Sequence, residues 1–371
     1  MVDSIVHQTD ALIFGGGPAG ASAALALLNY SSSDVILVEQ SDFNQVRVGE
    51  QVSASIFSLM DYLIIDKDEF DEGSFIPSYS GTSYWGSDRP NCRDSIFTTE
   101  QASFQLDRER FDFKLVEQVV HRGGRIFPRT RCILVDRLDN GGWRIQLKHP
   151  TQGVFYVEAK FLVDATGRNA SICKRLGAAP RKLDNLVGVG TFFNHDPQTM
   201  LAHEYLIEAA ELGWWYSALL PNNTIVVTFF SDADIVSHHR LHQGDNWAAL
   251  LQQTNHVKMR VKGASICSNK PWVRNAASQI TDFSSCKNFI AVGDAVSAFD
   301  PISSMGIGFA ISTACQAAGL IANNLTRNTI DAFASYQLDI TNHFNSYLET
   351  RNKFYQHECR WPKSDFWTRR H

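Results

Sequence analysis

The sequence predicts a mixed α/β protein in which a Rossmann-like domain is interleaved with a domain built on an antiparallel sheet. Three observations predict this fold. A glycine-rich turn joins a buried strand to a helix near the N-terminus, two later buried strands end in turns, and a segment rich in β-branched and aromatic residues lies between these motifs. A chain of 371 residues is long enough for two such domains.

Composition and charge exclude several classes of protein. Hydrophobic residues make up 44% of the chain and charged residues 20%, values that argue against disorder, collagen-like repeats and coiled coil. The net charge of −5 gives no electrostatic reason to expect nucleic-acid binding. No apolar run is long enough to span a bilayer, and Met1–Thr9 lacks the features of a signal peptide. We therefore expect a soluble cytoplasmic protein with neither a membrane nor a nucleic-acid partner.

The cysteines do not point to a disulfide framework or a metal centre. The seven cysteines form no CxxC pair, and their odd number argues against a set of disulfides. Cys359 lies near His357, but a tetrahedral zinc site normally needs four ligands. We expect no metal.

The first motif is the glycine-rich turn near the N-terminus. Its spacing fits GxGxxG at Gly15, Gly17 and Gly20. In such a turn the first glycine permits the tight bend, the second lets the backbone approach a pyrophosphate, and the third lets the helix pack on the strand. Pro18 and Ala19 begin the helix, whose exposed N–H groups would hold the phosphates.

The strand before this turn is Asp10–Phe14, and a second buried strand, Asp34–Val38, closes with Glu39 and Gln40. A carboxylate at this point can accept hydrogen bonds from ribose hydroxyls. The strand, the helix and the acidic residue together predict a dinucleotide site. The alternative is a glycine-rich turn that binds nothing, and the fingerprint alone does not separate FAD from NAD(P).

Three later segments separate these cofactors. The first is a turn after the second strand, Arg47–Glu50. The second is a buried strand that ends in Asp-Ala-Thr-Gly, within Phe161–Arg168. The third, Phe289–Gly308, is a buried strand followed by Gly-Asp and by the glycine-rich start of a helix. In order and spacing they resemble the fingerprints of the p-hydroxybenzoate-hydroxylase superfamily of FAD enzymes. The resemblance implies that the cofactor is FAD.

Several residues take roles from this resemblance. Asp294 would hold the ribityl chain, and Arg108 would reach the phosphates from a helix start; the alternative for Arg108 is a solvated Asp107–Arg108 pair. The turn before the last helix would present N–H groups to the flavin, where a helix N-terminus stabilises the negative charge of the reduced ring. The other cofactor-binding candidates in these motifs are Arg47, Pro301, Gly306, Ile307 and Gly308.

The middle of the chain is predicted to form strands, at Leu186–Phe193, Met200–Leu206, Trp214–Leu219 and Thr224–Phe230. An antiparallel sheet made of them would cover the flavin and form the substrate pocket. Because the cofactor motifs are spread along the chain, the FAD-binding domain must be discontinuous. We expect it to comprise residues 1–80, 105–184 and 272–371, ending in a helical tail, and the substrate domain to comprise residues 81–104 and 185–271.

Two motifs, Arg47–Glu50 and Asp300–Gly306, resemble the flavin-dependent halogenase branch of the superfamily. That branch also carries a WxWxIP motif, of which Gly213–Pro221 is only a loose echo. Halogenases further need a lysine in the tunnel that carries hypohalous acid. The nearest candidate, Lys67, lies in the acidic run Asp66–Glu69, and we interpret it as a surface lysine.

The C-terminal segment Tyr355–His371 is dense in aromatic residues and arginines, and together with Gly213–Ser217 it resembles the LodB-like flavoproteins. The resemblance covers essentially the whole chain. It implies a maturation enzyme that oxidises a tryptophan in a quinoprotein oxidase precursor, toward cysteine tryptophylquinone. We expect the tail to offer a basic contact surface, the alternative being a tail docked on its own domain. Its positive residues are Arg360, Lys363, Arg369, Arg370 and His371.

These observations lead to the hypothesis of an FAD-dependent monooxygenase that hydroxylates a tryptophan in a quinoprotein precursor. Glu50 and Asp300 are the carboxylates expected nearest the flavin, either as acid or base or as structural residues that hold loops beside FAD. No second GxGxxG is present, so we expect NAD(P)H to bind transiently or a separate reductase to supply reduced flavin. The alternatives are a flavin-dependent halogenase or hydroxylase of a small aromatic substrate, and a non-catalytic flavin-fold chaperone.

Overall fold

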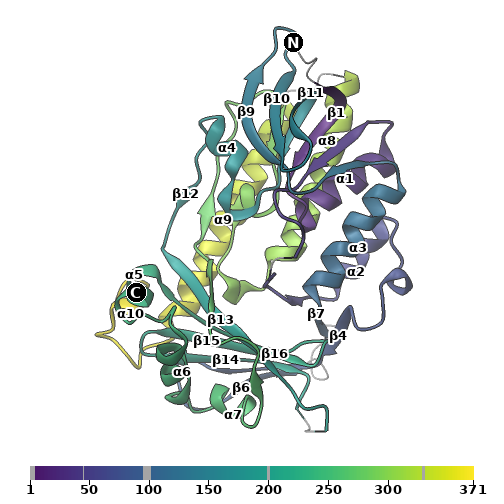
Figure 1. The fold of residues 1–371 in the computed structure, drawn as a ribbon. Helices are drawn as coiled ribbons and strands as arrows, with labels where there is room; N and C mark the ends of the chain where they lie inside the picture. The colour runs from purple at the N-terminus through teal and green to yellow at the C-terminus, as the bar shows by residue number, and fades with distance from the viewer. Residues whose placement is uncertain (1–4, 45, 95–101, 199–200, 328–330) are drawn as a thin grey trace.

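The computed structural model describes residues 5–44, 46–94, 102–198, 201–327 and 331–371. The Rossmann-like part lies at the top of Figure 1 and a second large sheet lies at the bottom. The long helix α9, Asp331–Gln356, runs from one part to the other. The mixed α/β fold predicted from the sequence is confirmed.

The first sheet has seven strands in the order β8-β2-β1-β11-β10-β9, with β20 pairing to β11. β8, β2, β1, β11 and β20 are parallel, and β10 and β9 extend the sheet in antiparallel fashion. The second half of β1 and all of β2 are buried, which explains why they read as continuous apolar runs rather than alternating ones. The bounds are Val6–Phe14 (β1), Val35–Val38 (β2), Arg125–Phe127 (β8), Arg131–Arg137 (β9), Trp143–His149 (β10), Gly153–Asp164 (β11) and Phe289–Ala291 (β20).

Helix α1, Pro18–Tyr30, follows the glycine-rich turn and packs along α8, Gly306–Arg327. Proline suits the first position of α1, because no intrahelical acceptor exists there for an N–H group. Residues Gly306–Leu325 of α8 are long and apolar enough to cross a membrane by length and composition alone, although the sequence analysis expected no such segment. The buried residues of α8, Ile311 and Ile321 among them, belong to the core shared with α1, which accounts for their apolar character.

The second sheet has eight strands in the order β17-β13-β16-β15-β14-β5-β6, with β18 pairing to β13. It is antiparallel as predicted except that β14 and β5 are parallel. The long stretch of chain between these two strands permits a parallel pairing, which a short hairpin would not. The predicted strand Met200–Leu206 is observed at Glu204–Ala210, because β14 pairs with β15 up to a two-residue turn; Met200 lies outside the described residues. The bounds are Ser80–Tyr84 (β5), Asn91–Asp94 (β6), Leu186–Asn194 (β13), Glu204–Ala210 (β14), Gly213–Leu219 (β15), Thr224–Asp232 (β16), Ser265–Ile266 (β17) and Trp272–Asn275 (β18).

There are two small sheets among the described residues, β3-β7-β4 and β12-β19-β21. Their strands are Gln51–Val52 (β3), Phe75–Ser78 (β4), Ser103–Leu106 (β7), Arg181–Lys182 (β12), Gln279–Ile280 (β19) and Ser297–Ala298 (β21). The remaining helices are Ser55–Tyr62 (α2), Arg108–His121 (α3), Ser171–Arg175 (α4), Ala233–His238 (α5), Gly244–Gln252 (α6), Val257–Arg260 (α7) and Asp365–Thr368 (α10). Short 3₁₀ turns include Lys67–Glu69 (η1), Gly167–Asn169 (η3), Gly293–Ala295 (η4) and Pro301–Ser303 (η5).

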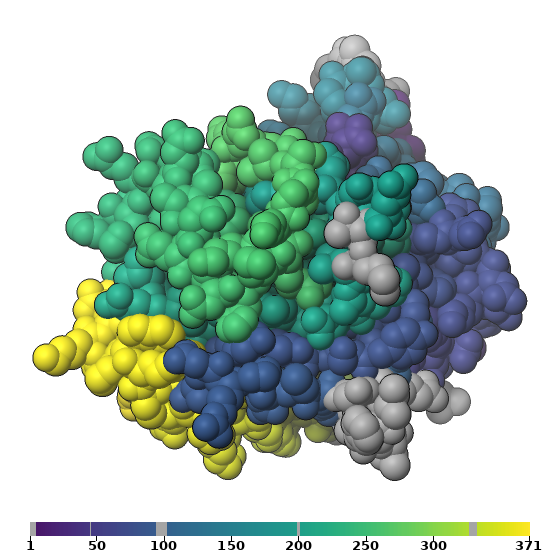
Figure 2. All heavy atoms as spheres, turned by 90° about the horizontal axis from the view of Figure 1, so that it is seen from below, coloured from purple at the N-terminus to yellow at the C-terminus, as the bar shows by residue number. Residues whose placement is uncertain are grey.

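The C-terminal tail is docked on the second sheet. Phe366 and Trp367 are fully buried there, and the Trp367 indole N–H donates to the carbonyl of Ala210 at 3.0 Å. The tail arginines are paired within the chain: Arg360 with Asp88 and Glu358, Arg369 with Asp232 and Asp234, and Arg370 with Asp232. Figure 2 shows the yellow C-terminal residues packed beside the blue part of the chain. The expected basic contact surface is therefore wrong for these arginines, because each finds an acidic partner on its own chain.

Candidate functional site

The glycine-rich turn has the geometry of a dinucleotide cradle. Gly15 has φ +108°, and a Cβ placed there would lie 2.2 Å from the Ala165 carbonyl oxygen. A Cβ on Gly20 would lie 1.8 Å from the Gly15 carbonyl oxygen, so only glycine lets α1 start this close to β1. Gly17, by contrast, has no atom within 4 Å of its Cβ position. Gly15 and Gly20 are thus required by the fold, whereas Gly17 leaves open space for a ligand over the first turn of α1, which Pro18 and Ala19 begin.

Glu39 lies beside this turn. One of its carboxylate oxygens accepts a hydrogen bond from the Gly16 N–H at 2.6 Å, and the other accepts one from the Ser41 N–H at 2.7 Å. Glu39 is half-buried, and Gln40 after it is exposed. The carboxylate is thus fixed at the edge of the cradle, and its contact with a ribose hydroxyl stays a prediction.

The two predicted arginines meet at a carboxylate that the sequence analysis missed. Asp112 binds the Arg47 guanidinium at 2.6 Å and the Arg108 guanidinium at 2.9 Å. Arg108 also donates to the carbonyls of Val48 and Gly49, so it holds the predicted turn against α3. The Arg108 side chain is mostly buried, which excludes a solvated helix-start pair. Asp112 could have been found from its position one helical turn after Arg108.

Asp294 and the start of α8 lie on the other side of the cradle. A Cβ on Gly293 would lie 2.8 Å from the Cβ of Ala19, which places the Gly-Asp turn directly against α1. Asp294 forms an ion pair with Arg168 at 3.3 Å and keeps about a third of its side chain exposed. Gly306 and Gly308 have nothing within 4 Å of their Cβ positions. The space where their side chains would point is therefore open at the start of α8, while Ile307 between them is buried and Pro301 lies in the preceding turn.

Glu50 is the one predicted acid–base candidate with a carboxylate oxygen free of partners. Only 4% of Glu50 is exposed, and its Oε1 has no hydrogen-bond partner among the described residues. Burial raises the pKa of Glu50 to about 7, against the opposing effect of the nearby Arg108 charge. Glu50 can therefore exchange a proton near neutral pH.

Asp300 has the structural one of its two predicted roles in this arrangement, and its role as an acid–base candidate is corrected. It is completely buried, and one carboxylate oxygen binds both Arg351 at 3.1 Å and the Tyr355 hydroxyl at 2.8 Å. The other oxygen accepts from the Ile302 N–H at 3.1 Å. With a buried cation and a hydroxyl bound to it, the carboxylate anchors the turn before α8 to α9. The sequence offered this structural role as an alternative, but it did not show the partner, because Arg351 lies 51 residues further along the chain.

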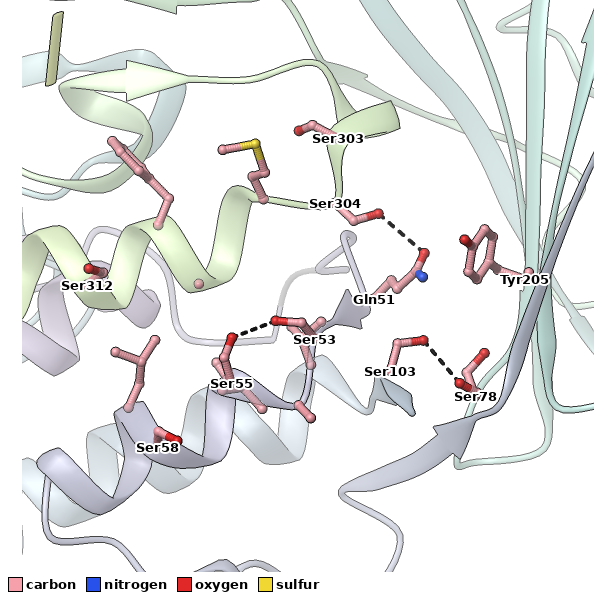
Figure 3. Close-up of a pocket in the computed structure, with 18 of the residues that line it drawn as sticks. Gln51, Ser53, Ser55, Ser58, Ser78, Ser103, Tyr205, Ser303, Ser304 and Ser312 are labelled. Carbon is pink, nitrogen blue, oxygen red and sulfur yellow. Dashed lines mark hydrogen bonds between the residues drawn. The ribbon is translucent and has the colours of Figure 1, made fainter. Parts of the chain in front are cut away.

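A cleft of about 1330 Å³ lies beside the start of α8, between α2 and the second sheet (Figure 3). It is rich in hydroxyl groups: nine of its described lining residues are serines, namely Ser53, Ser55, Ser58, Ser78, Ser80, Ser103, Ser303, Ser304 and Ser312. These serines come from several distant segments, which is why no local sequence pattern indicated the cleft. Met305, Gly308 and Gln51 connect the cleft to the predicted flavin edge.

A smaller chamber of about 370 Å³ continues the cleft along α9. The two share the lining residues Ile302, Ser303, Met305 and His343. The α9 residues that line it recur at intervals of i, i+3, i+4, i+7, i+8 and i+11, which places them on one face of the helix: His343, Ser346, Tyr347, Thr350, Arg351 and Phe354. Among the described residues that line the two chambers, none is acidic and none is a lysine.

The halogenase-like features do not reach the cleft. Lys67 is exposed, its ammonium lies 4.6 Å from the ring centre of Phe57, and it is not among the described residues that line the cleft. Trp214 and Trp215 are buried in separate hydrophobic clusters on opposite faces of β15, so the echo of WxWxIP is core packing. Trp214 donates to the Tyr355 hydroxyl at 3.0 Å, which ties the sheet to α9.

The FAD binding domain family matches residues 8–344. The chain is 42% identical over 366 residues to the FAD-dependent oxidoreductase LodB of Marinomonas mediterranea, and the alignment covers 99% of this chain and 98% of that protein. The chain belongs to the LodB-like FAD-dependent oxidoreductases.

Solved structures agree on the fold of this LodB-like oxidoreductase. The flavin-dependent halogenase CmlS superposes with a TM-score of 0.86 at 23% identity, covering 98% of this chain and 68% of CmlS. QhpG, a peptidyl tryptophan dihydroxylase essential for tryptophylquinone cofactor biogenesis, superposes with a TM-score of 0.77 at 24% identity, covering 98% of this chain and 78% of QhpG. The resemblance to LodB-like flavoproteins seen in the sequence is confirmed.

Proposed function

We propose that this protein is an FAD-dependent monooxygenase that hydroxylates a tryptophan side chain in a quinoprotein oxidase precursor, as a step toward cysteine tryptophylquinone. The observation that carries the proposal is the large, open and hydroxyl-lined cleft beside the start of α8. The similarity of the protein to LodB over nearly the whole chain supports the same reaction class, as does the likeness of its fold to that of a peptidyl tryptophan dihydroxylase.

The shape of the cleft and its serine hydroxyls favour a polypeptide substrate over a free small molecule. A second chamber continues the main chamber along α9, so the cleft extends beyond the space beside the predicted flavin edge. Serine hydroxyls can both donate to and accept from the amide groups of a backbone. An extended segment could lie along α9 and place one side chain in the main chamber.

The residues present fit FAD. Gly17 leaves space for the pyrophosphate, Glu39 lies beside the turn where the ribose is expected, and Gly306 and Gly308 leave space at the N-terminus of α8. When bound, FAD supplies the two electrons with which O₂ is activated, so that one oxygen atom enters a C–H bond of the indole and the other leaves as water. Arg108 fixes the turn that carries Glu50.

The protein's own part in the reaction is positioning, exclusion of water and proton transfer. The second sheet covers one side of the cleft and would hold the substrate ring away from solvent. Glu50 can carry a proton on its unpaired Oε1 near neutral pH. The electrons would come from NAD(P)H bound transiently or from a partner flavin reductase, and we propose that the enzyme acts in the cytoplasm.

Replacing Gly17 by aspartate tests the proposal. The new carboxylate would occupy the pyrophosphate space, so FAD content should fall and the precursor should no longer gain oxygen by mass spectrometry. Gly319→Asp is the matched control, because Gly319 is an exposed residue of α8 with no atom within 4 Å of its Cβ position. If the precursor still matures with the Gly17→Asp protein, catalysis by FAD is wrong and the chaperone alternative is favoured.

The second candidate function is halogenation of a small aromatic molecule, which the fold likeness to CmlS favours. The absence of lysine among the described lining residues of the cleft argues against it. Incubation of the reduced enzyme with O₂, bromide and free tryptophan distinguishes the two. A brominated product would establish halogenation and contradict the monooxygenase proposal.

A further inference from the structure

Tyr205 is an aromatic residue in the cleft whose ring position is set by a glycine. It lies on β14 opposite Gly81 of the parallel strand β5, and both residues line the cleft. A Cβ on Gly81 would lie 2.0 Å from Cζ and 2.4 Å from the hydroxyl oxygen of Tyr205. The ring therefore lies across the space that any other side chain at position 81 would fill.

The Tyr205 ring packs against the second sheet on one side and lines the cleft on the other. It packs against the small buried cluster of Ala218, Leu220 and Val226 in the second sheet. No other aromatic ring of the described residues stacks on it, and its hydroxyl has no hydrogen-bond partner among them. The lining residue Phe309 differs, because its ring is stacked on His343 with centroids 5.5 Å apart.

Tyr205 faces the wall of the cleft that is nearest the predicted flavin edge. Figure 3 shows it across from Gln51, whose side-chain oxygen accepts a hydrogen bond from the Ser304 hydroxyl at 3.3 Å. Gln51 follows Glu50, and Ser304 precedes the start of α8. A planar group bound between Tyr205 and this wall would therefore lie next to the site where oxygen is activated.

We propose that Tyr205, seated on Gly81, is the aromatic platform that binds the ring of the substrate. This inference rests on the proposed function, because it assumes an aromatic target. Aromatic rings attract each other in offset-stacked or edge-to-face arrangements, and an electron-rich indole suits such a contact. Tyr205 is a residue that determines specificity for an aromatic side chain, and it takes no part in proton or electron transfer.

The test compares ring removal, hydroxyl removal and ring displacement. Oxidised holoenzyme is titrated with N-acetyl-tryptophanamide, followed by flavin fluorescence, with N-acetyl-leucinamide as the aliphatic comparison. Tyr205→Leu should weaken binding of the tryptophan probe by about 2- to 10-fold, whereas Tyr205→Phe should bind like the wild type. Gly81→Ala should resemble Tyr205→Leu, because its Cβ meets the end of a side chain and moves the ring without disturbing the strand.

Tyr156→Leu is the matched control, since Tyr156 lies on β11 with its ring against Arg144 and away from the cleft. FAD content is measured for every variant, so that a binding change is separated from a folding defect. Equal affinity of Tyr205→Leu and Tyr156→Leu for the tryptophan probe, or a wild type that does not bind it, overturns the proposal.

Two separate measurements distinguish a failure of the Tyr205 proposal from a failure of the proposed function. Oxygen gain by the precursor with wild-type enzyme tests the function, whereas the probe titration tests Tyr205 without any turnover. With active enzyme, the Tyr205→Leu substitution should raise the KM for the precursor more than it lowers kcat. A fall in kcat alone would contradict a binding platform.

Discussion

Glu50→Gln should change the pH dependence of stability in a calculable way. The Glu50 carboxyl has its pKa raised by burial from 4.5 to about 7. At about 1.4 kcal/mol for each tenfold change in proton affinity, this difference favours the neutral form in the folded protein by about 3 kcal/mol. Because the folded state holds this proton more tightly, it binds more protons than the unfolded state between about pH 4.5 and pH 7. Wild-type stability therefore falls as the pH rises through this window.

Glutamine has nearly the same shape and cannot ionise, so the substituted protein lacks this contribution. The two proteins should have similar free energies of unfolding at about pH 4.5, and the glutamine protein should become more stable than the wild type by about 3 kcal/mol near pH 8. Urea unfolding at a series of pH values measures this, and other titrating groups cancel in the difference between the proteins. Glu349→Gln, at an exposed position of α9, is the control.

A difference between wild type and Glu50→Gln that stays constant from about pH 5 to about pH 8 would refute the reasoning. It would mean that Glu50 is hydrated or paired in solution. Its role as a proton carrier near neutral pH would then have no physical basis.

Three further predictions concern the cradle, the α9 anchor and the cleft. Gly20→Ala should cost at least about 3 kcal/mol of stability, because its Cβ would lie 1.8 Å from the Gly15 carbonyl oxygen. Gly17→Ala should keep a native circular dichroism spectrum and lose only FAD affinity. Equal stability of the two substituted proteins would contradict this prediction. Arg351→Met should lower the free energy of unfolding in urea by about 3–5 kcal/mol, because it leaves the Asp300 carboxylate buried without its cation. A decrease below about 1 kcal/mol would show that this ion pair does not hold the turn before α8. Chloride or bromide should leave the mass of the oxidised product unchanged, because no lysine is found among the described residues that line the cleft, and a halogenated product detected by mass spectrometry would disprove this.

The cofactor half of the protein was predictable because its requirements are local. Gly15 and Gly20 meet conformational and steric needs of one turn, Gly17 leaves space for a ligand, and the spacing of the three glycines records these local needs directly. Buried parallel strands also show in the sequence as short apolar runs. The order of these motifs was enough to predict a Rossmann-like FAD domain, and the family match confirms it.

The charged residues were harder to interpret, because a charge in a sequence does not show its partner. Asp300 looked like a carboxylate beside the flavin, yet Arg351 and Tyr355 bind it from α9. Likewise, Arg370 looked like part of a basic surface, yet it pairs with Asp232 of the second sheet. In both cases the partner lies far away in the chain, and pairing in a buried place determines whether a charge is available.

The sequence by itself determined that the chain has a glycine-rich turn of an FAD binding domain and that a strand-rich segment is inserted between the cofactor motifs. Only the tertiary structure decided what surrounds the reaction site: a cleft lined by serines from several segments, the Tyr205 ring resting on Gly81, and a tail folded back onto its own sheet. The physical reason is that a tight turn is specified by neighbouring residues, whereas a cavity is the space left between elements that meet only in the folded chain.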